Sequence, residues 1–191
     1  MKKLVLVLLL AMLVACNPSQ PKQHFVGTDI TGADFNQTFH LKDHTGKPRT
    51  LSDFKGKVVV LFFGYTHCPD VCPTTMNDLK HTIKLLGSKA DEVQVLFITL
   101  DPERDSQEVL AKFVPSFNPS FLGLRGDATE TADTIANFKI YAKKVASEGR
   151  SGYTLDHSAG MYVYDKKGKL RLYINYGETP VEISSDIKQI L

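Results

Sequence analysis

Two cysteines separated by three residues carry the most specific chemical signal in this 191-residue chain. They lie in the segment Cys68-Pro69-Asp70-Val71-Cys72-Pro73, shortly after an apolar run that ends near Tyr65. A thiolate is the reactive form both in disulfide exchange and in metal binding, and a helix N-terminus stabilises it. The pair therefore predicts thiol chemistry, metal binding or a structural disulfide.

These three interpretations differ in what else they require. A chain of this length buries a sizeable core, so it gains little from so short a structural bridge. Dithiol oxidoreductases usually carry Cys-x-x-Cys, whereas three residues stand between Cys68 and Cys72. The third interpretation, a metal site, would combine the two thiolates with an imidazole from elsewhere in the chain.

His157 is the candidate for that imidazole. Thioredoxin-like oxidoreductases carry a cis-proline just before the strand that faces their cysteines. In this chain the candidate strand begins at Ser158, and no proline occurs between Pro119 and Pro180. His157 occupies roughly that place and is expected to point toward the cysteine loop. Asp156 either orients the His157 ring, as metal-bound histidines commonly require, or is a simple turn residue.

Two thiolates and one imidazole form a donor set that favours copper. Soft sulfur ligands select copper(I), and an added imidazole also accommodates copper(II). Zinc would normally take a fourth ligand or an open water position, although composition does not exclude it. The sequence predicts a copper site of Cys68, Cys72 and His157.

Other residues near these motifs are expected to have structural roles. Strand alternation should point His67 away from the thiols, and Met76 lies at helical spacing with other apolar residues, which favours packing. Asp101 and Asp105 are expected to cap the helix that follows Pro102.

The elements that must position these residues follow from the apolar pattern. The run Val58–Phe63 predicts a buried central strand within 57–65, and a second strand is predicted over 93–100. Between them a helix is expected to begin at Pro73 and to end at Gly87. The other expected features are a turn at 43–46, a helix at 107–113, a strand at 121–124, a helix at 128–138, a hairpin of 158–164 and 170–176, and a final helix from 180 capped by Thr179. This order is that of an α/β, thioredoxin-like fold.

The first sixteen residues predict export and lipid attachment. Two lysines precede an apolar run from Leu4 to Ala15, which is shorter than the roughly 20 residues that span a bilayer. The segment Leu13-Val14-Ala15-Cys16 looks like the lipobox of bacterial lipoproteins; the alternative is an ordinary signal followed by a chance cysteine. We expect a signal peptide at 1–15, a tether at 16–24 lipidated at Cys16, and one domain at 25–191. The domain would then lie on the extracytoplasmic (periplasmic) side, anchored to a membrane of the cell envelope.

Charge gives no indication of a nucleic-acid partner. Loss of Lys2 and Lys3 with the signal peptide reduces 23 basic residues to 21, which equals the 21 acidic residues. No long basic run or patch is present in the mature sequence, so we expect no nucleic-acid binding.

Three separated segments, in order, complete the pattern: Phe63-Gly64-Tyr65-Thr66-His67-Cys68-Pro69-Asp70-Val71-Cys72-Pro73, Asp101-Pro102-Glu103-Arg104-Asp105 and Asp156-His157-Ser158. Together they resemble the signature of the Sco/SenC family of copper proteins, over about residues 25 to 190. The resemblance implies a thioredoxin-like fold with an additional β-hairpin and one copper ion bound by Cys68, Cys72 and His157.

The resemblance also implies a role in assembling the dinuclear copper site of cytochrome c oxidase, as copper donor or as reductant of that site's cysteines. The expected partner is the copper-site subunit of the oxidase or another envelope copper protein. We expect a metallochaperone rather than an enzyme with turnover. The alternative is a thiol-disulfide reductase or peroxidase of the envelope that acts through Cys68 and Cys72.

Overall fold

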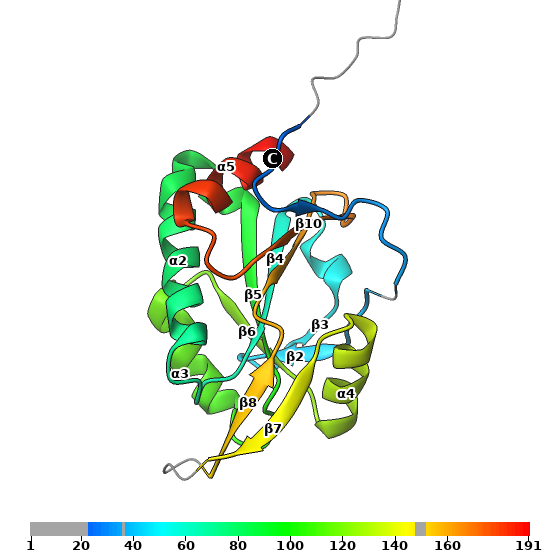
Figure 1. Cartoon of the computed structure of the whole chain (residues 1–191), viewed down its shortest axis with the longest axis vertical. Coiled ribbons are helices and arrows are strands. Elements are labelled where there is room, and N and C mark those ends of the chain that lie inside the picture. Colours follow the sequence, from blue (N-terminus) through cyan, green and yellow to red (C-terminus); the bar gives the residue numbers. More distant parts are fainter. Residues whose placement is uncertain (1–22, 36, 148–151) are drawn as a thin grey trace, which may run out of the picture.

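A mixed eight-stranded sheet forms the centre of the fold, in the strand order β1-β10-β9-β4-β5-β6-β2-β3 (Figure 1). The computed structural model describes residues 23–35, 37–147 and 152–191, so Cys16 and the predicted signal peptide lie outside the described residues. The strands of this sheet are β1 (Thr28–Asp29), β2 (Leu41–Asp43), β3 (Pro48–Arg49), β4 (Val58–Gly64), β5 (Val93–Thr99), β6 (Leu122–Arg125), β9 (Met161–Tyr164) and β10 (Leu170–Ile174).

The two central strands position the cysteine loop. β4 and β5 run parallel and are buried at every position, as expected for apolar strands covered on both faces. Their pairing sets Gly64 beside Thr99, so the segments that follow the two strands emerge at the same edge of the sheet. β9 runs antiparallel to β4 on its other side and leads back from the segment that contains His157.

Helices cover both sides of this sheet. They are α2 (Val71–Leu86), α3 (Gln107–Phe117), α4 (Ala128–Asn137) and α5 (Pro180–Ile190), with short 3-10 turns at Leu51–Phe54 and Gly87–Glu92. α2 packs against α5, and Figure 1 shows this pair on one side of the sheet and α4 on the other. Within the part of the chain that the structure describes, no helix combines the length and apolar character needed to cross a membrane.

Most of the predicted elements are confirmed, with shifted ends. The carboxylate of Asp43 accepts hydrogen bonds from the backbone of Thr45 and Lys47 and so forms the predicted turn. The Thr179 side chain caps α5, as expected. α2, however, begins at Val71 and not at Pro73, because a proline is tolerated anywhere in the first helical turn. Cys72 is therefore a helix residue.

A pair of strands outside the main sheet was not predicted. β7 (Ala142–Ala146) and β8 (Tyr153–His157) pair antiparallel with each other in a separate two-stranded sheet, named here the β7–β8 arm. The strand expected from Ser158 begins instead at Met161, and His157 is the last residue of β8. The candidate ligand is thus carried by the arm and not by the main sheet.

Candidate metal centre

Cys68 and Cys72 lie between the end of β4 and the first turn of α2, and both are free thiols. The backbone N–H of Cys72 donates to Sγ of Cys68 at 3.3 Å. Cys72 is fully buried at 0% exposure, whereas Cys68 is half-buried. The helix N-terminus favours negative charge at this place, which supports a thiolate.

Gly64 makes room for the buried thiol. A Cβ atom at this position would lie 2.9 Å from Sγ of Cys72 and 3.0 Å from the ring of Phe97. Real Cβ atoms do not tolerate such contacts without movement of the neighbour. The glycine at the end of β4 therefore lets the first turn of α2 approach the sheet.

The structure brings His157 to the thiols from across the fold. Nε2 of His157 lies 3.7 Å from Sγ of Cys72, although 85 residues separate them in sequence. Nδ1 lies 2.8 Å from the carbonyl oxygen of Ser158. A carbonyl can only accept, so Nδ1 carries a proton, and in the neutral imidazole the lone pair is on Nε2, which faces the cysteines.

A backbone carbonyl, that of Ser158, orients the ring of His157, whereas Asp156 was considered either as a partner of the ring or as a simple turn residue. Asp156 is exposed and borders the site. Since successive side chains in a strand point to opposite faces, the residue next to His157 in β8 is poorly placed to reach its ring. The contact that fixes Nδ1 of His157 therefore comes from the backbone.

The two thiols hold their protons very differently. A hydrogen bond from the Cys72 thiol lowers the pKa of Cys68 to about 3. The same contact, together with burial, raises the pKa of Cys72 far above the ordinary thiol range. One sulfur is therefore a thiolate and the other a thiol, and metal binding by both requires the release of one proton.

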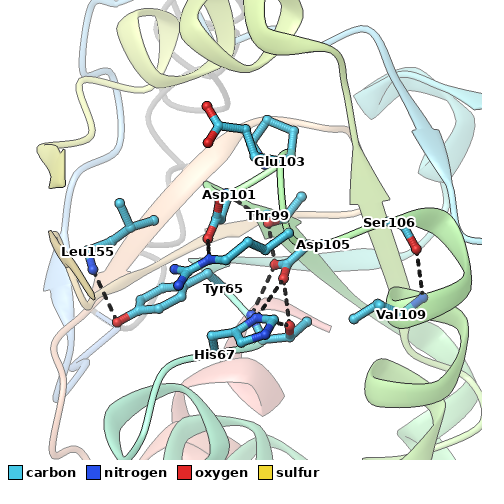
Figure 2. A network of polar contacts seen from close by, with 12 residues as sticks. Tyr65, His67, Thr99, Asp101, Glu103, Asp105, Ser106, Val109 and Leu155 are labelled. Atoms are coloured by element: carbon cyan, nitrogen blue, oxygen red, sulfur yellow. Dashed lines mark hydrogen bonds and ion pairs between the residues drawn. The ribbon is translucent and has the colours of Figure 1, made fainter. Parts of the chain in front are cut away.

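Tyr65, which the sequence analysis did not select, packs against the histidine. Its ring lies edge-on to that of His157, with centroids 5.9 Å apart and planes at 81°. Its hydroxyl accepts a hydrogen bond from the backbone N–H of Leu155 at 3.2 Å, shown in Figure 2. Burial raises the pKa of Tyr65, so the hydroxyl stays protonated. The sequence feature that could have identified Tyr65 as a site residue is its position at the end of the apolar run, three residues before Cys68.

Asp105 anchors the segment that leads into the cysteine loop. Its carboxylate accepts from the backbone N–H of Thr66 at 3.0 Å and from the hydroxyl of Thr66 at 2.5 Å. It also accepts from the hydroxyl of Thr99 at 2.6 Å (Figure 2). The expectation that Asp101 and Asp105 cap the following helix is wrong, because Ser106 caps α3. Both carboxylates are buried and used for tertiary contacts instead.

Two residues excluded as ligands are placed as predicted. Nδ1 of His67 lies 3.7 Å from Asp105, with its side chain 43% exposed, so it turns toward the carboxylate network. Met76 is completely buried in the core. Neither residue lines the hollow beside the thiols, whose walls are formed in part by Tyr65, Cys68, Pro69, Leu155, His157 and Ala159.

The donor atoms face one another but are not yet closed around an ion. Across residues 23–35, 37–147 and 152–191, no group of three or more His, Cys, Asp or Glu side chains stands in an arrangement ready to hold a metal. The Cys72 thiol instead donates a hydrogen bond to the sulfur of Cys68. The chemistry of the set, two sulfurs and an imidazole nitrogen with its lone pair directed at them, fits copper once that proton is lost.

Comparison with known proteins gives a family-level match. The family model described as SCO1/SenC matches residues 27–191. A Danio rerio relative, named Protein SCO2 homolog, mitochondrial, is 38% identical over 152 residues, which cover 78% of this chain and 54% of the relative. The chain thus spans little more than half the length of that relative.

Two solved structures extend the comparison to the fold. ScoI of Bradyrhizobium japonicum, solved with copper bound, is 40% identical and covers 83% of this chain and 100% of its own, with a TM-score of 0.75. Yeast Sco1 with copper bound is 31% identical over 82% of this chain and 87% of its own, with a TM-score of 0.73. These structures confirm the predicted thioredoxin-like fold. The chain belongs to the SCO1/SenC family.

Proposed function

We propose that this chain is a copper metallochaperone that holds one copper ion through Cys68, Cys72 and His157. The observation that carries the proposal is the approach of His157 Nε2 to within 3.7 Å of Cys72 Sγ. Copper-bound structures of ScoI from Bradyrhizobium japonicum and of yeast Sco1 support the choice of metal.

The site suits transfer of copper more than permanent retention. Cys72 is buried behind the site, whereas the half-buried Cys68 and His157 both border an open hollow, through which a partner thiol can reach a bound ion. Two thiolates and a neutral imidazole give a net charge of minus one with copper(I) and zero with copper(II). The oxidation state therefore changes the local field that a partner meets.

The recipient in this proposal is the copper-site subunit of cytochrome c oxidase, the role implied by the family resemblance. The anchor at Cys16 would hold the domain at the extracytoplasmic face of an envelope membrane. Replacement of Cys16 by serine should leave the precursor uncleaved or the protein mislocalised, as fractionation and mass spectrometry of the N-terminus would show. Wild-type maturation and membrane association of that variant would contradict the lipid anchor.

Thiol-disulfide exchange is the second candidate function, and the accessible, low-pKa thiol of Cys68 favours it. The two activities are compatible, because oxidation of the pair to a disulfide removes both sulfur ligands. One site could then deliver copper only while its cysteines are reduced.

Copper titration of the reduced domain tests the proposal. The wild type should bind one copper per chain and show sulfur-to-copper charge-transfer absorption in the copper(II) form. The double variant Cys68→Ala/Cys72→Ala should lose both oxidation states. His157→Ala should lose copper(II) and keep part of the copper(I) binding, because two thiolates alone can hold the softer ion.

His67→Ala is the matched control, because His67 is the neighbour of Cys68 but turns toward Asp105. It should bind both ions as the wild type does. Full copper binding by the double cysteine variant would contradict the site. In cells, normal oxidase assembly with His157→Ala but failed assembly with the cysteine variants would make thiol reduction the primary function.

A further inference from the structure

The β7–β8 arm depends on side-chain contacts for its position relative to the thiols. Its two strands hydrogen-bond in a ladder of their own, separate from the eight-stranded sheet. His157 stands at the end of β8 that adjoins the site. Whatever fixes this arm therefore fixes the distance from the imidazole to the sulfurs.

Three residues form a closed set of contacts at the other end of β8. The Tyr153 hydroxyl donates to one carboxylate oxygen of Asp101 at 2.8 Å, and Arg104 Nε donates to the other at 2.5 Å. Arg104 also donates from Nη1 to the Tyr153 carbonyl at 3.0 Å, and its guanidinium carbon lies 3.6 Å from the centroid of the Tyr153 ring. We name this set the Asp101–Arg104–Tyr153 clasp.

Burial makes the clasp stronger than the surface ion pair beside it. The Asp101 carboxylate is 0% exposed and the Arg104 side chain 16%, so their attraction is little screened by water. Lys144 and Glu103 also join the arm to this segment, at 2.7 Å, but their side chains are 50% and 67% exposed. Such exposed pairs contribute little, about 0–1 kcal/mol. The clasp is therefore the principal polar attachment between the arm and this segment.

The same short segment also holds the cysteine loop. Asp105, the residue after Arg104, accepts two hydrogen bonds from Thr66, which stands two residues before Cys68. Residues 101–105 thus contact the β7–β8 arm through Asp101 and Arg104 and the segment before the cysteines through Asp105. The segment acts as a spacer that sets how far His157 lies from Cys72.

We propose that Arg104 is a positioning residue that sets the affinity for copper(II) relative to copper(I) by fixing the arm through Tyr153. The inference rests on the copper site of the proposed function. Tyr153 stands four residues before His157, roughly 13 Å along an extended strand, so Arg104 acts through β8 and not by contact with the ion. Displacement of the arm withdraws the imidazole, on which copper(II) depends more than copper(I) does.

The test compares both oxidation states in Arg104→Ala, with Lys143→Ala as the control that removes an exposed positive charge from the same arm. Arg104→Ala should weaken copper(II) binding on the order of tenfold, a loss typical of residues that support a ligand from behind. Copper(I) binding should stay within about twofold. A tenfold selective loss corresponds to a rise of about 59 mV in the copper(II)/copper(I) potential. Lys143→Ala should match the wild type in all three measurements.

Two further variants keep the test decisive. Arg104→Lys retains the charge but not the planar fork, so its copper(II) affinity should resemble that of Arg104→Ala. Tyr153→Phe retains the ring and loses the hydroxyl's bond to Asp101 and its longer, exposed contact with Glu103, so it should fold even where Arg104→Ala does not, with a smaller copper(II) loss in the same direction.

Two results would overturn the proposal. The first is an unchanged ratio of copper(II) to copper(I) affinity in Tyr153→Phe and in the folded Arg104 variants. The second is an equal loss of both ions, which would indicate general destabilisation. Copper binding by Cys68→Ala/Cys72→Ala, measured in the same series, would instead refute the copper site itself and the inference with it.

Discussion

At the scale of single residues, the two sulfurs of the site differ in reactivity. Cys68 is half-buried with its pKa lowered to about 3, whereas Cys72 is enclosed and its pKa is raised. In the proposed thiol-disulfide exchange, an external disulfide would therefore meet Cys68 first, and the enclosed Cys72 would be the second thiol to react.

This difference predicts selective alkylation of the metal-free, reduced protein. At pH 6, iodoacetamide should modify Cys68 on the order of tenfold faster than Cys72 or more, because Cys68 is the accessible thiolate. Peptide mapping by mass spectrometry measures both rates. In Cys68→Ser, Cys72 should remain slow to react, since burial still protects it; faster labelling of Cys72 than of Cys68 in the wild type would contradict the assignment.

The sequence was sufficient to select the three candidate donors but not the residues that place them. Cys68 and Cys72 are adjacent in a recognisable pattern, and the missing proline directed attention to His157. The support from Asp105 and Asp101 joins residues 39 and 52 positions apart, and local spacing contains no sign of such pairs. In the sequence, an aspartate between a strand and a helix looks like a helix cap. Only the tertiary structure shows that Asp101 and Asp105 accept hydrogen bonds from other elements instead.

At the scale of elements, the packing of α2 against β4 predicts a specific role for Gly64. Gly64→Ala should force Sγ of Cys72 or the Phe97 ring to move and should cost about 1–3 kcal/mol of stability. Copper affinity should fall as well, because the displaced sulfur is one of the proposed ligands. Chemical denaturation and copper titration measure the two effects.

Gly123→Ala is the matched control for this prediction. A Cβ at Gly123 would lie 2.9 Å from Val114, an equally close contact on β6 between that strand and α3. This variant should lose stability but keep copper affinity. If both variants lost affinity to the same extent, the effect of Gly64→Ala would not be specific to Cys72.

The turn between β2 and β3 predicts a dependence of stability on pH. Burial alone would raise the pKa of Asp43, but hydrogen bonds from Thr45, Arg49 and Lys47 outweigh it and lower the pKa to about 2. Because the folded-state pKa lies below the ordinary value of 3.8, the contribution is complete above about pH 4–5 and is lost as pH falls toward 2. Asp43→Asn should be about 2 kcal/mol less stable than the wild type at pH 7, with the difference shrinking in acid.

Urea denaturation at several pH values measures this dependence. Asp34→Asn is a suitable control, because Asp34 is exposed and should give a constant, small difference. A stability gap between wild type and Asp43→Asn that stayed the same from pH 7 to pH 2.5 would contradict the role of the carboxylate.

The central strands and helices were predictable because they bury continuous or periodic apolar faces. The β7–β8 arm was not, because β7 buries almost nothing: its five residues are exposed or half-buried throughout, and two of them are lysines. Strands held mainly by each other and by a few buried polar contacts leave no hydrophobic period in the sequence. This is why the strand expected from Ser158 was placed too early.

At the scale of the whole molecule, the start of the described chain is fastened to its end. The buried carboxylate of Asp186 in α5 accepts from the backbone N–H groups of Val26 at 3.1 Å and Gly27 at 2.8 Å. β1 then pairs with β10. The segment before β1 is therefore part of the folded domain.

Asp186→Ala should release this segment without disturbing the proposed copper site. The loss of a buried acceptor for two N–H groups should cost about 1–3 kcal/mol. Hydrogen exchange should accelerate at Val26 and Gly27, while copper stoichiometry stays at one per chain. Asp186→Asn keeps one acceptor oxygen and should show a smaller effect; unchanged exchange in both variants would contradict the role of this contact.

The contacts between residues 23–24 and Gln189 also determine which face of the protein stays accessible when one end is attached to something else. Gln23 donates to the carbonyl of Gln189 at 2.6 Å and Gln189 donates to that of His24 at 3.0 Å, so both described ends meet beside α5, while the β7–β8 arm extends toward the opposite end of the molecule (Figure 1). A tag or a fused protein joined after Leu191 therefore lies away from the arm that carries His157. In the proposed function, such an attachment leaves the hollow beside Cys68 and His157 open to a second protein.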